Sequence, residues 1–158
     1  MMFKVGLGFD SHRLVAGRPL IVGGVNIPST VGCLAHSDGD VLIHALIDAL
    51  LGAGGLGDIG QKFPDTDPAY KNISSLELLQ RVMAEVKASG LAVVNADCLV
   101  ILEKPRLAPF IDQMKERLCP LLGLQPSSLG IKAKTAEGLG EIGAGQAVEA
   151  WATVLLAG

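Results

Sequence analysis

The sequence predicts an α+β fold, a two-layer sandwich with a mixed four-stranded sheet and helices on one face. Long stretches in the second half of the chain alternate apolar and polar residues, as half-buried strands do. Amphipathic helical patterns stand between those stretches, and one earlier segment is apolar almost all round, which is typical of a buried helix. At 158 residues, without an internal repeat or a linker, the chain is expected to form a single domain over residues 1–158.

Three short apolar segments near the start of the chain predict strands. They are Phe3–Phe9, Leu20–Val22 and Val25–Ile27. The last two flank Gly23 and Gly24, and two apolar runs around a glycine pair predict a hairpin. Residues 28–35 are expected to be a loop that leads to the buried helix.

The buried helix is expected to start at a cap provided by Ser37 or Asp38, whose short side chains accept N–H groups of a first turn. Asp40, His44 and Asp48 recur every four residues and therefore share one helical face, while the other positions are apolar. Burying an unpaired polar group is costly, so His44 needs a partner. From the helical spacing we expect Asp48 to orient its imidazole.

The second half of the chain predicts two helices and three strands. The expected strands are Leu91–Leu102, Leu129–Lys134 and Val148–Leu156. Ser74-x-x-Glu77 is a capping box that opens an amphipathic helix ending near Gly90. Pro105 is expected to open the other helix, which Gly123 ends.

Composition excludes several classes of function. The net charge is −3 and no basic cluster occurs, so nucleic acid is not expected as a partner. Apolar residues make up 49% of the chain and charged residues 18%. This apolar content is high for a small soluble monomer, so we expect part of the apolar surface to lie in contacts between subunits. Cys33, Cys98 and Cys119 are odd in number and widely spaced, as is typical of thiols in a reducing compartment. Without a signal-peptide pattern or a membrane-spanning run, we expect a cytoplasmic protein that makes no membrane contact.

The chain has three histidines, and two of them fit a metal site. Asp10 and His12 stand at i and i+2 of a strand, so both point to one side and can meet His44 at one ion. Two imidazoles and a carboxylate with an open fourth position suit zinc. In the alternative interpretation His44 is a core histidine bonded to carboxylates of its own helix, and the residues alone leave both open.

Three loops have compositions that suit ligands. A glycine-rich segment ends at Asp58–Gly60, where backbone can approach a ligand closely. The acidic turn Phe63–Pro68 is either a stiff Asx-rich loop or a loop that binds a metal or a hydroxyl. Lys134, Thr135 and Glu137 precede further glycines at a strand end, which suits phosphate groups and a divalent cation, although the order is not that of a P-loop.

Five motifs together resemble the 2-C-methyl-D-erythritol 2,4-cyclodiphosphate synthase family, over the full chain and in the family's order. They are Gly8-Phe-Asp-x-His12, Ala35-His-Ser-Asp-Gly-Asp-x-x-x-His-Ala45, Leu56-Gly-Asp-Ile-Gly60, Phe63-Pro-Asp-Thr-Asp-Pro68 and Lys132-Ala-Lys-Thr-x-Glu-Gly-Leu-Gly140. The resemblance implies a single catalytic domain with lyase activity in the non-mevalonate isoprenoid pathway. Its small-molecule cytidine diphosphate substrate, 4-diphosphocytidyl-2-C-methyl-D-erythritol 2-phosphate, would be cyclised with release of CMP, in a homotrimer with shared active sites.

The resemblance also implies roles for individual residues. Zinc, one ion per subunit, is expected at Asp10, His12 and His44, and Mg²⁺ or Mn²⁺ bound with substrate is expected at Glu137. His36 and Thr135 are expected to stabilise the transition state. Substrate contacts are expected at Asp10, His12, His36, Ser37, Asp58, Ile59, Gly60, Phe63, Pro64, Asp65, Thr66, Asp67, Leu102, Glu103, Lys104, Pro105, Arg106, Leu107, Ala108, Lys134, Thr135, Ala136 and Glu137. Two other classes stay open, a zinc-dependent phosphoesterase and a non-catalytic trimeric scaffold.

Overall fold

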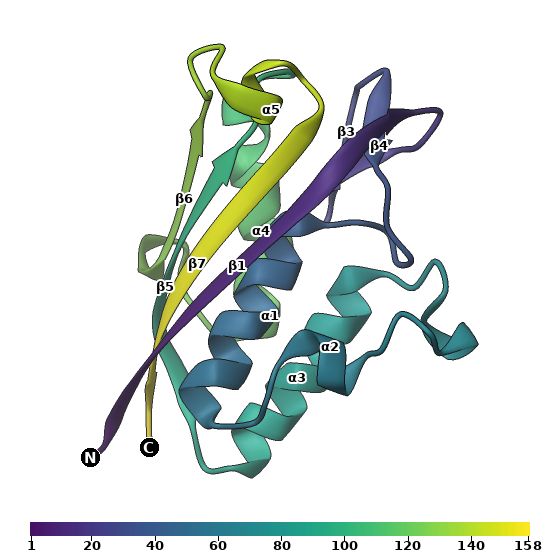
Figure 1. The fold of residues 1–158 in the computed structure, drawn as a ribbon. Helices are drawn as coiled ribbons and strands as arrows, with labels where there is room; N and C mark the ends of the chain where they lie inside the picture. The colour runs from purple at the N-terminus through teal and green to yellow at the C-terminus, as the bar shows by residue number, and fades with distance from the viewer.

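The computed structural model describes all 158 residues, as a five-stranded sheet, a separate hairpin and three long helices on one face of the sheet (Figure 1). The strands are β1 (Phe3–Ala16), β2 (Leu20–Val22), β3 (Val25–Ile27), β4 (Val31–Cys33), β5 (Ala92–Ile101), β6 (Leu129–Lys134) and β7 (Ala147–Ala157). The helices are α1 (Val41–Gly54), α2 (Ile59–Lys62), α3 (Ser75–Ala88), α4 (Ile111–Leu122) and α5 (Gly140–Gly143), with 3-10 turns η1 (Pro68–Tyr70), η2 (Ala108–Phe110) and η3 (Pro126–Ser128). No helix is both long enough and apolar enough to cross a membrane.

The sheet has the strand order β4-β1-β7-β5-β6, with β5 and β6 parallel and the other pairs antiparallel. The predicted α+β class with a mixed sheet is confirmed, but the prediction of four strands is wrong. The fifth strand, β4, lies in the expected loop. It is three residues long, too short to show an alternating pattern, and it forms by pairing with the far end of β1, which extends to Ala16 rather than ending at Phe9.

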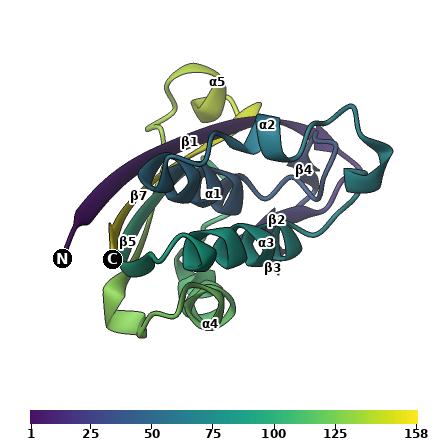
Figure 2. The ribbon, with the colours of Figure 1, turned by 90° about the horizontal axis from the view of Figure 1, so that it is seen from below.

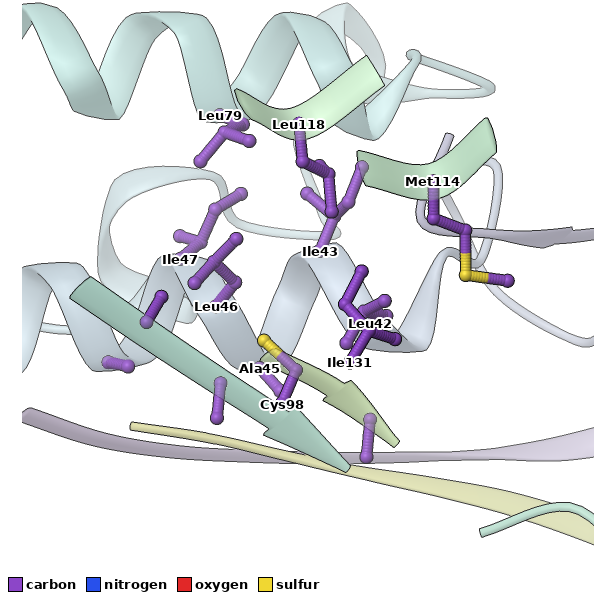
Figure 3. Packing of buried hydrophobic residues seen from close by; sticks show 14 of the residues in the cluster. Leu42, Ile43, Ala45, Leu46, Ile47, Leu79, Cys98, Met114, Leu118 and Ile131 are labelled. Carbon is purple, nitrogen blue, oxygen red and sulfur yellow. The ribbon is translucent and has the colours of Figure 1, made fainter. Parts of the chain in front are cut away.

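Helix α1 lies between the sheet and α3, and α3 packs in turn on α4 (Figure 2). The core forms where α1 meets the sheet on one side and the outer helices on the other (Figure 3). The side chains that fill this region include Leu42, Ile43, Leu46, Ile47, Leu79, Cys98, Met114, Leu118 and Ile131. A helix buried on nearly all sides matches its apolar sequence, so the prediction of a buried helix is confirmed.

Two glycines bring β1 close to the backbone of α1. A Cβ atom on Gly8 would lie 1.8 Å from the carbonyl oxygen of Ala45, and one on Gly6 would lie 1.9 Å from that of Ala49. No side chain larger than hydrogen fits at these positions. The same face of β1 continues past Gly8 to the polar residues that point at α1.

The helix caps differ from those predicted. Helix α1 is capped by Asp40, not by Ser37 or Asp38, because Asp40 Oδ1 accepts the N–H of Ile43 at 3.1 Å. Helix α3 begins where predicted, but Ser74 makes no side-chain cap bond, so the predicted capping box does not form. A carboxylate from another part of the chain, Asp38, accepts the N–H of Ser75 at 2.9 Å instead.

Two further predictions about the second half are wrong in detail. Pro105 does not open a helix: it follows a cis peptide bond in the segment between β5 and η2, and α4 begins only at Ile111. In β5, a register shift between Val93 and Asn95 buries Val93 and leaves Val94 exposed, against the simple alternation expected.

Candidate active site

Asp10, His12 and His44 converge in the structure. The first two lie on the α1-facing side of β1, and His44 projects from the first turn of α1. Asp10 Oδ2 lies 2.9 Å from His12 Nε2 and 3.0 Å from His44 Nδ1, and the two nitrogens are 3.1 Å apart. The three predicted ligands therefore lie together, each offering one atom to a common point.

The spacing of these three atoms fits a tetrahedral metal ion. Ligands about 2.05 Å from such an ion lie about 3.3 Å from one another, close to the separations in the structure. Two imidazole nitrogens and a carboxylate oxygen form a donor set that zinc accepts, with a fourth position free for another ligand. The residues present thus fit zinc.

The electrostatics of the cluster are those of groups that share protons or a cation. Burial works to raise the pKa of Asp10, but hydrogen bonds to His12 and His44 and their charges lower it to about 2. Burial disfavours a charged imidazole at His44, yet the hydrogen bond and charge of Asp10 outweigh it and raise its pKa. Protons stabilise the cluster when it holds no metal, and a divalent cation would bind by displacing them.

The outer nitrogen of His44 faces two hydroxyls. His44 Nε2 lies 2.9 Å from Ser75 Oγ and 3.2 Å from Ser37 Oγ. The expectation that Asp48 orients this imidazole is wrong, since Asp48 Oδ1 accepts the N–H of Ile59 at 2.8 Å and so anchors α2. Sequence reasoning missed Ser75, because it stands on α3 and no local spacing relates it to His44.

Asp40 is not a partner of the imidazole either. Its carboxylate is fully buried and accepts the N–H groups of Gly23 at 2.9 Å and Gly24 at 2.7 Å, besides that of Ile43. It therefore ties the β2–β3 hairpin to the start of α1. The alternative in which carboxylates of its own helix satisfy His44 is wrong.

A cavity of about 450 Å³ opens beside the cluster. Its walls are His12, Leu34, Ala35, His36, Ser37, His44, Ile59, Gly60, Phe63, Pro64, Asp65, Tyr70, Ile73 and Leu78. Eight of the residues predicted to bind substrate are on this wall: His12, His36, Ser37, Ile59, Gly60, Phe63, Pro64 and Asp65. Of the other residues predicted from the same motifs, Asp10 belongs to the cluster, while Asp58, Thr66 and Asp67 are outside the wall.

Two of those residues outside the wall hold parts of the cavity in place through hydrogen bonds. Asp58 caps α2 by accepting the N–H of Gln61 at 2.8 Å. The carbonyl oxygen of Asp67 lies 3.2 Å from His36 Nε2, which joins the histidine to the acidic turn. The N–H of Asn72 is donated to the carbonyl oxygen of His36 at 2.8 Å, so the position of His36 is fixed on two sides.

A second cavity, of about 330 Å³, lies where β5 and β6 end side by side. Its walls are Leu102, Glu103, Pro105, Arg106, Leu107, Ala108, Pro109, Ala133, Lys134 and Thr135. Parallel pairing places Ile101 opposite Lys134, which brings together two motifs predicted separately. Lys104, Ala136 and Glu137 are outside this wall, although Ala136 donates its N–H to Glu103 Oε2 at 3.1 Å.

The two cavities share no wall residue, so one chain does not unite the predicted ligands with the predicted phosphate loop. Thr135 donates its hydroxyl to Glu137 Oε1 at 3.2 Å, and both side chains are at the protein surface. The backbone of Glu137 has a positive φ of 53°, in the left-handed region that a non-glycine residue seldom adopts.

The model of the YgbB family matches residues 3–157. The chain belongs to the YgbB family. A relative from Geobacillus kaustophilus, named 2-C-methyl-D-erythritol 2,4-cyclodiphosphate synthase, is 53% identical over 155 residues, 98% of each chain. This confirms the resemblance that the five motifs predicted.

Two solved structures of similar proteins have the same fold. The bifunctional IspDF from Campylobacter jejuni is 42% identical with a TM-score of 0.94, over 98% of this chain and 42% of that longer one. A 2C-methyl-D-erythritol-2,4-cyclodiphosphate synthase in its CDP-bound form is 46% identical with a TM-score of 0.90, over 98% of this chain and 100% of the other. The YgbB fold therefore extends across the whole chain.

Proposed function

We propose that this YgbB-family chain is a 2-C-methyl-D-erythritol 2,4-cyclodiphosphate synthase, a lyase that forms one catalytic domain over residues 1–158. It converts 4-diphosphocytidyl-2-C-methyl-D-erythritol 2-phosphate to the 2,4-cyclodiphosphate and CMP, in non-mevalonate isoprenoid biosynthesis. The observation that carries the proposal is the convergence of Asp10, His12 and His44 at the wall of a 450 Å³ cavity. Two of the relatives described above carry this activity in their names.

The reaction joins two phosphates of one substrate. An oxygen of the 2-phosphate bonds to the β-phosphorus, and the bond from that phosphorus to the bridging oxygen breaks, so its electron pair leaves with CMP. The attacking phosphate is already an anion, so the site requires no strong base, and the tether makes the attack intramolecular. The task of the protein is to bring anions together and to stabilise charge as CMP departs.

Several side chains fit those tasks. Zinc at Asp10, His12 and His44, with Mg²⁺ or Mn²⁺ at Glu137, would supply positive charge to phosphate oxygens. His36 is fixed beside the first cavity by its contact with Asp67. Because the carbonyl oxygen of Asp67 takes the hydrogen on Nε2, the protonated form of this imidazole is the one with a second N–H, on Nδ1, to donate to a transferring phosphate. Thr135 offers a hydroxyl for the same purpose at the second cavity.

The second cavity has the features of a nucleotide site. Arg106 and Lys134 place two cationic side chains in its wall, and these attract a diphosphate. The CDP-bound state of one relative supports a cytidine nucleotide as the ligand. The substrate is thus divided between the cavities, with its cytidine end against the β5 and β6 ends and its methylerythritol end beside His44.

Two observations support the proposal of a homotrimer with shared sites. Each of the two cavities holds half of the proposed site, and the two are separate within one chain, so a complete site needs two subunits. The face of β1 away from α1 carries an apolar row, Phe3, Val5, Leu7 and Phe9, which is between 41% and 74% exposed. Trp151 on β7 continues this row, with its ring 4.5 Å from that of Phe9. An exposed apolar surface of this extent indicates a contact between subunits.

The free thiols Cys33, Cys98 and Cys119 are all buried, which fits a reducing compartment, and we propose that the enzyme works in the cytoplasm.

The co-product of the reaction tests the function. Chromatography after incubation with the diphosphocytidyl substrate, zinc and magnesium is expected to show CMP. Release of inorganic phosphate instead would support a zinc-dependent phosphoesterase, which the relatives do not favour.

A further inference from the structure

The hydroxyl of Ser75 stands between a carboxylate and the outer nitrogen of His44. Ser75 is fully buried at the first residue of α3. Its Oγ donates to Asp38 Oδ1 and lies 2.9 Å from His44 Nε2. Asp38 Oδ2 also accepts the N–H of Ser75 at 2.9 Å, so one carboxylate accepts from both hydrogen-bond donors of this serine. The three residues come from the loop before α1, from α1 and from α3, and they form one continuous chain of hydrogen bonds.

Only one donor-to-acceptor direction along these hydrogen bonds leaves His44 able to bind a metal. A serine hydroxyl has a single hydrogen, and an ionised carboxylate can only accept, so Ser75 gives that hydrogen to Asp38. Only lone pairs of Ser75 Oγ then remain for His44, so the hydrogen between them belongs to Nε2. A neutral imidazole with its hydrogen on Nε2 has a lone pair on Nδ1, and Nδ1 is the atom that meets Asp10 and His12.

The opposite direction would defeat the site. If Ser75 donated to Nε2, the imidazole hydrogen would be on Nδ1, which is 3.1 Å from His12 Nε2 and could not bind a metal. Ser37 Oγ, at 3.2 Å from Nε2, also accepts the N–H of Gly39 at 3.3 Å, so it supplies a second and longer contact.

We propose that Asp38 and Ser75 are positioning residues, which fix the imidazole of His44 with its hydrogen on Nε2 and the lone pair of Nδ1 directed at the metal site. The inference rests on the metal-binding part of the proposed function. Partners that hold a metal-bound histidine in this way contribute about 10- to 100-fold to metal affinity. The two residues thus act on the metal through His44, without contacting the three ligand atoms themselves.

The test measures zinc affinity of metal-stripped protein by competition with a chelator. Ser75→Ala removes the hydroxyl, and Asp38→Asn gives it an amide partner that can donate and so reverse the chain. Each is expected to weaken zinc binding by about 10- to 100-fold. Ser74→Ala is the matched control, because this neighbouring serine makes no side-chain cap bond, and its affinity is expected to equal that of the parent.

The outcomes separate a positioning role from a purely structural one. If Ser75→Ala and Asp38→Asn lower the free energy of unfolding of the metal-free protein but bind zinc as tightly as the parent, the residues only cap α3 and the proposal is overturned. A parent protein that binds no zinc would refute the metal site itself. A parent that binds zinc alongside equally tight variants refutes only the positioning chain.

A measurement on the unmodified protein tests the proposal even if a variant fails to fold. In nitrogen-15 NMR spectra of the zinc-loaded parent, the ring of His44 is expected to be bound through Nδ1, with a slowly exchanging hydrogen on Nε2. In Ser75→Ala that hydrogen is expected to exchange faster with water. Coordination through Nε2, or an Nε2 hydrogen that exchanges as fast in the parent as in Ser75→Ala, would overturn the proposal.

Discussion

Mixing two inactive variants tests whether each active site is shared between subunits. His44→Ala removes a ligand beside the first cavity, and Thr135→Ala removes a hydroxyl at the second, which is expected to cost about a hundredfold in rate. Because the two cavities share no wall residue, each variant keeps one half-site intact. In the proposed trimer, mixing the variants would therefore create complete sites that neither variant contains alone.

The size of the recovery follows from the arrangement. A site is complete only when the subunit that supplies the metal ligands is Thr135→Ala and its neighbour is His44→Ala. With equal amounts and random exchange, each condition holds for half of the positions, so about one quarter of the sites should be active. The assay is CMP release by chromatography after the two variants are refolded together, with mass spectrometry to confirm mixed trimers.

A matched control keeps the experiment sharp. His44→Ala mixed with Asp10→Asn damages the same half-site in both subunits, so no recovery is expected from that pair. If confirmed mixed trimers of His44→Ala and Thr135→Ala stay as inactive as their parents, each site lies within one subunit and the reasoning from the separate cavities is refuted.

Three further predictions concern single residues. His44→Ala should yield purified protein without zinc but still trimeric, as judged by elemental mass spectrometry and light scattering; near-stoichiometric zinc would remove His44 from the ligand set. Glu137→Gln should keep zinc but raise the magnesium concentration at half-maximal activity, and an unmoved midpoint would mean that Glu137 has another role. Burial raises the pKa of the Asp40 carboxyl from 3.8 to about 6. Between these two pH values the folded state keeps a proton that the unfolded state has lost, so the free energy of unfolding falls as the pH rises from 4 to 6. When the pH is lowered from 7 to 4, the free energy of unfolding of the metal-free parent, measured with denaturant, should rise by up to about 3 kcal/mol relative to that of Asp40→Asn. The same pH dependence in both proteins would contradict this assignment.

The part of the site that depends on local geometry was predictable from the sequence. Asp10 and His12 share one side of a strand because their spacing is two, and the apolar pattern around His44 required its helix to be buried. These two local rules, with the donor chemistry of zinc, are sufficient to propose the cluster that the structure contains. The motif resemblance then placed the remaining site residues, which no periodicity could do.

The parts that depend on distant segments were not predictable in this way. Asp38 caps α3 and holds Ser75, a contact across 37 positions of the chain. Helical spacing pointed to Asp48 as the partner of His44, but the start of α2 competes for that carboxylate. Strand β4 exists only through its pairing with β1. In each case the free energy comes from a partner that local propensity does not identify.

Phosphorus NMR of the product tests the central claim most directly, because it distinguishes a ring from two separate phosphates. With the diphosphocytidyl substrate, zinc and magnesium, the enzyme is expected to form CMP and an equal amount of a compound whose two phosphorus nuclei are coupled through one bridging oxygen. CMP accompanied by an uncoupled 2,4-bisphosphate would show that water, and not the 2-phosphate, cleaves the diphosphate, and would contradict the assignment as a cyclodiphosphate synthase.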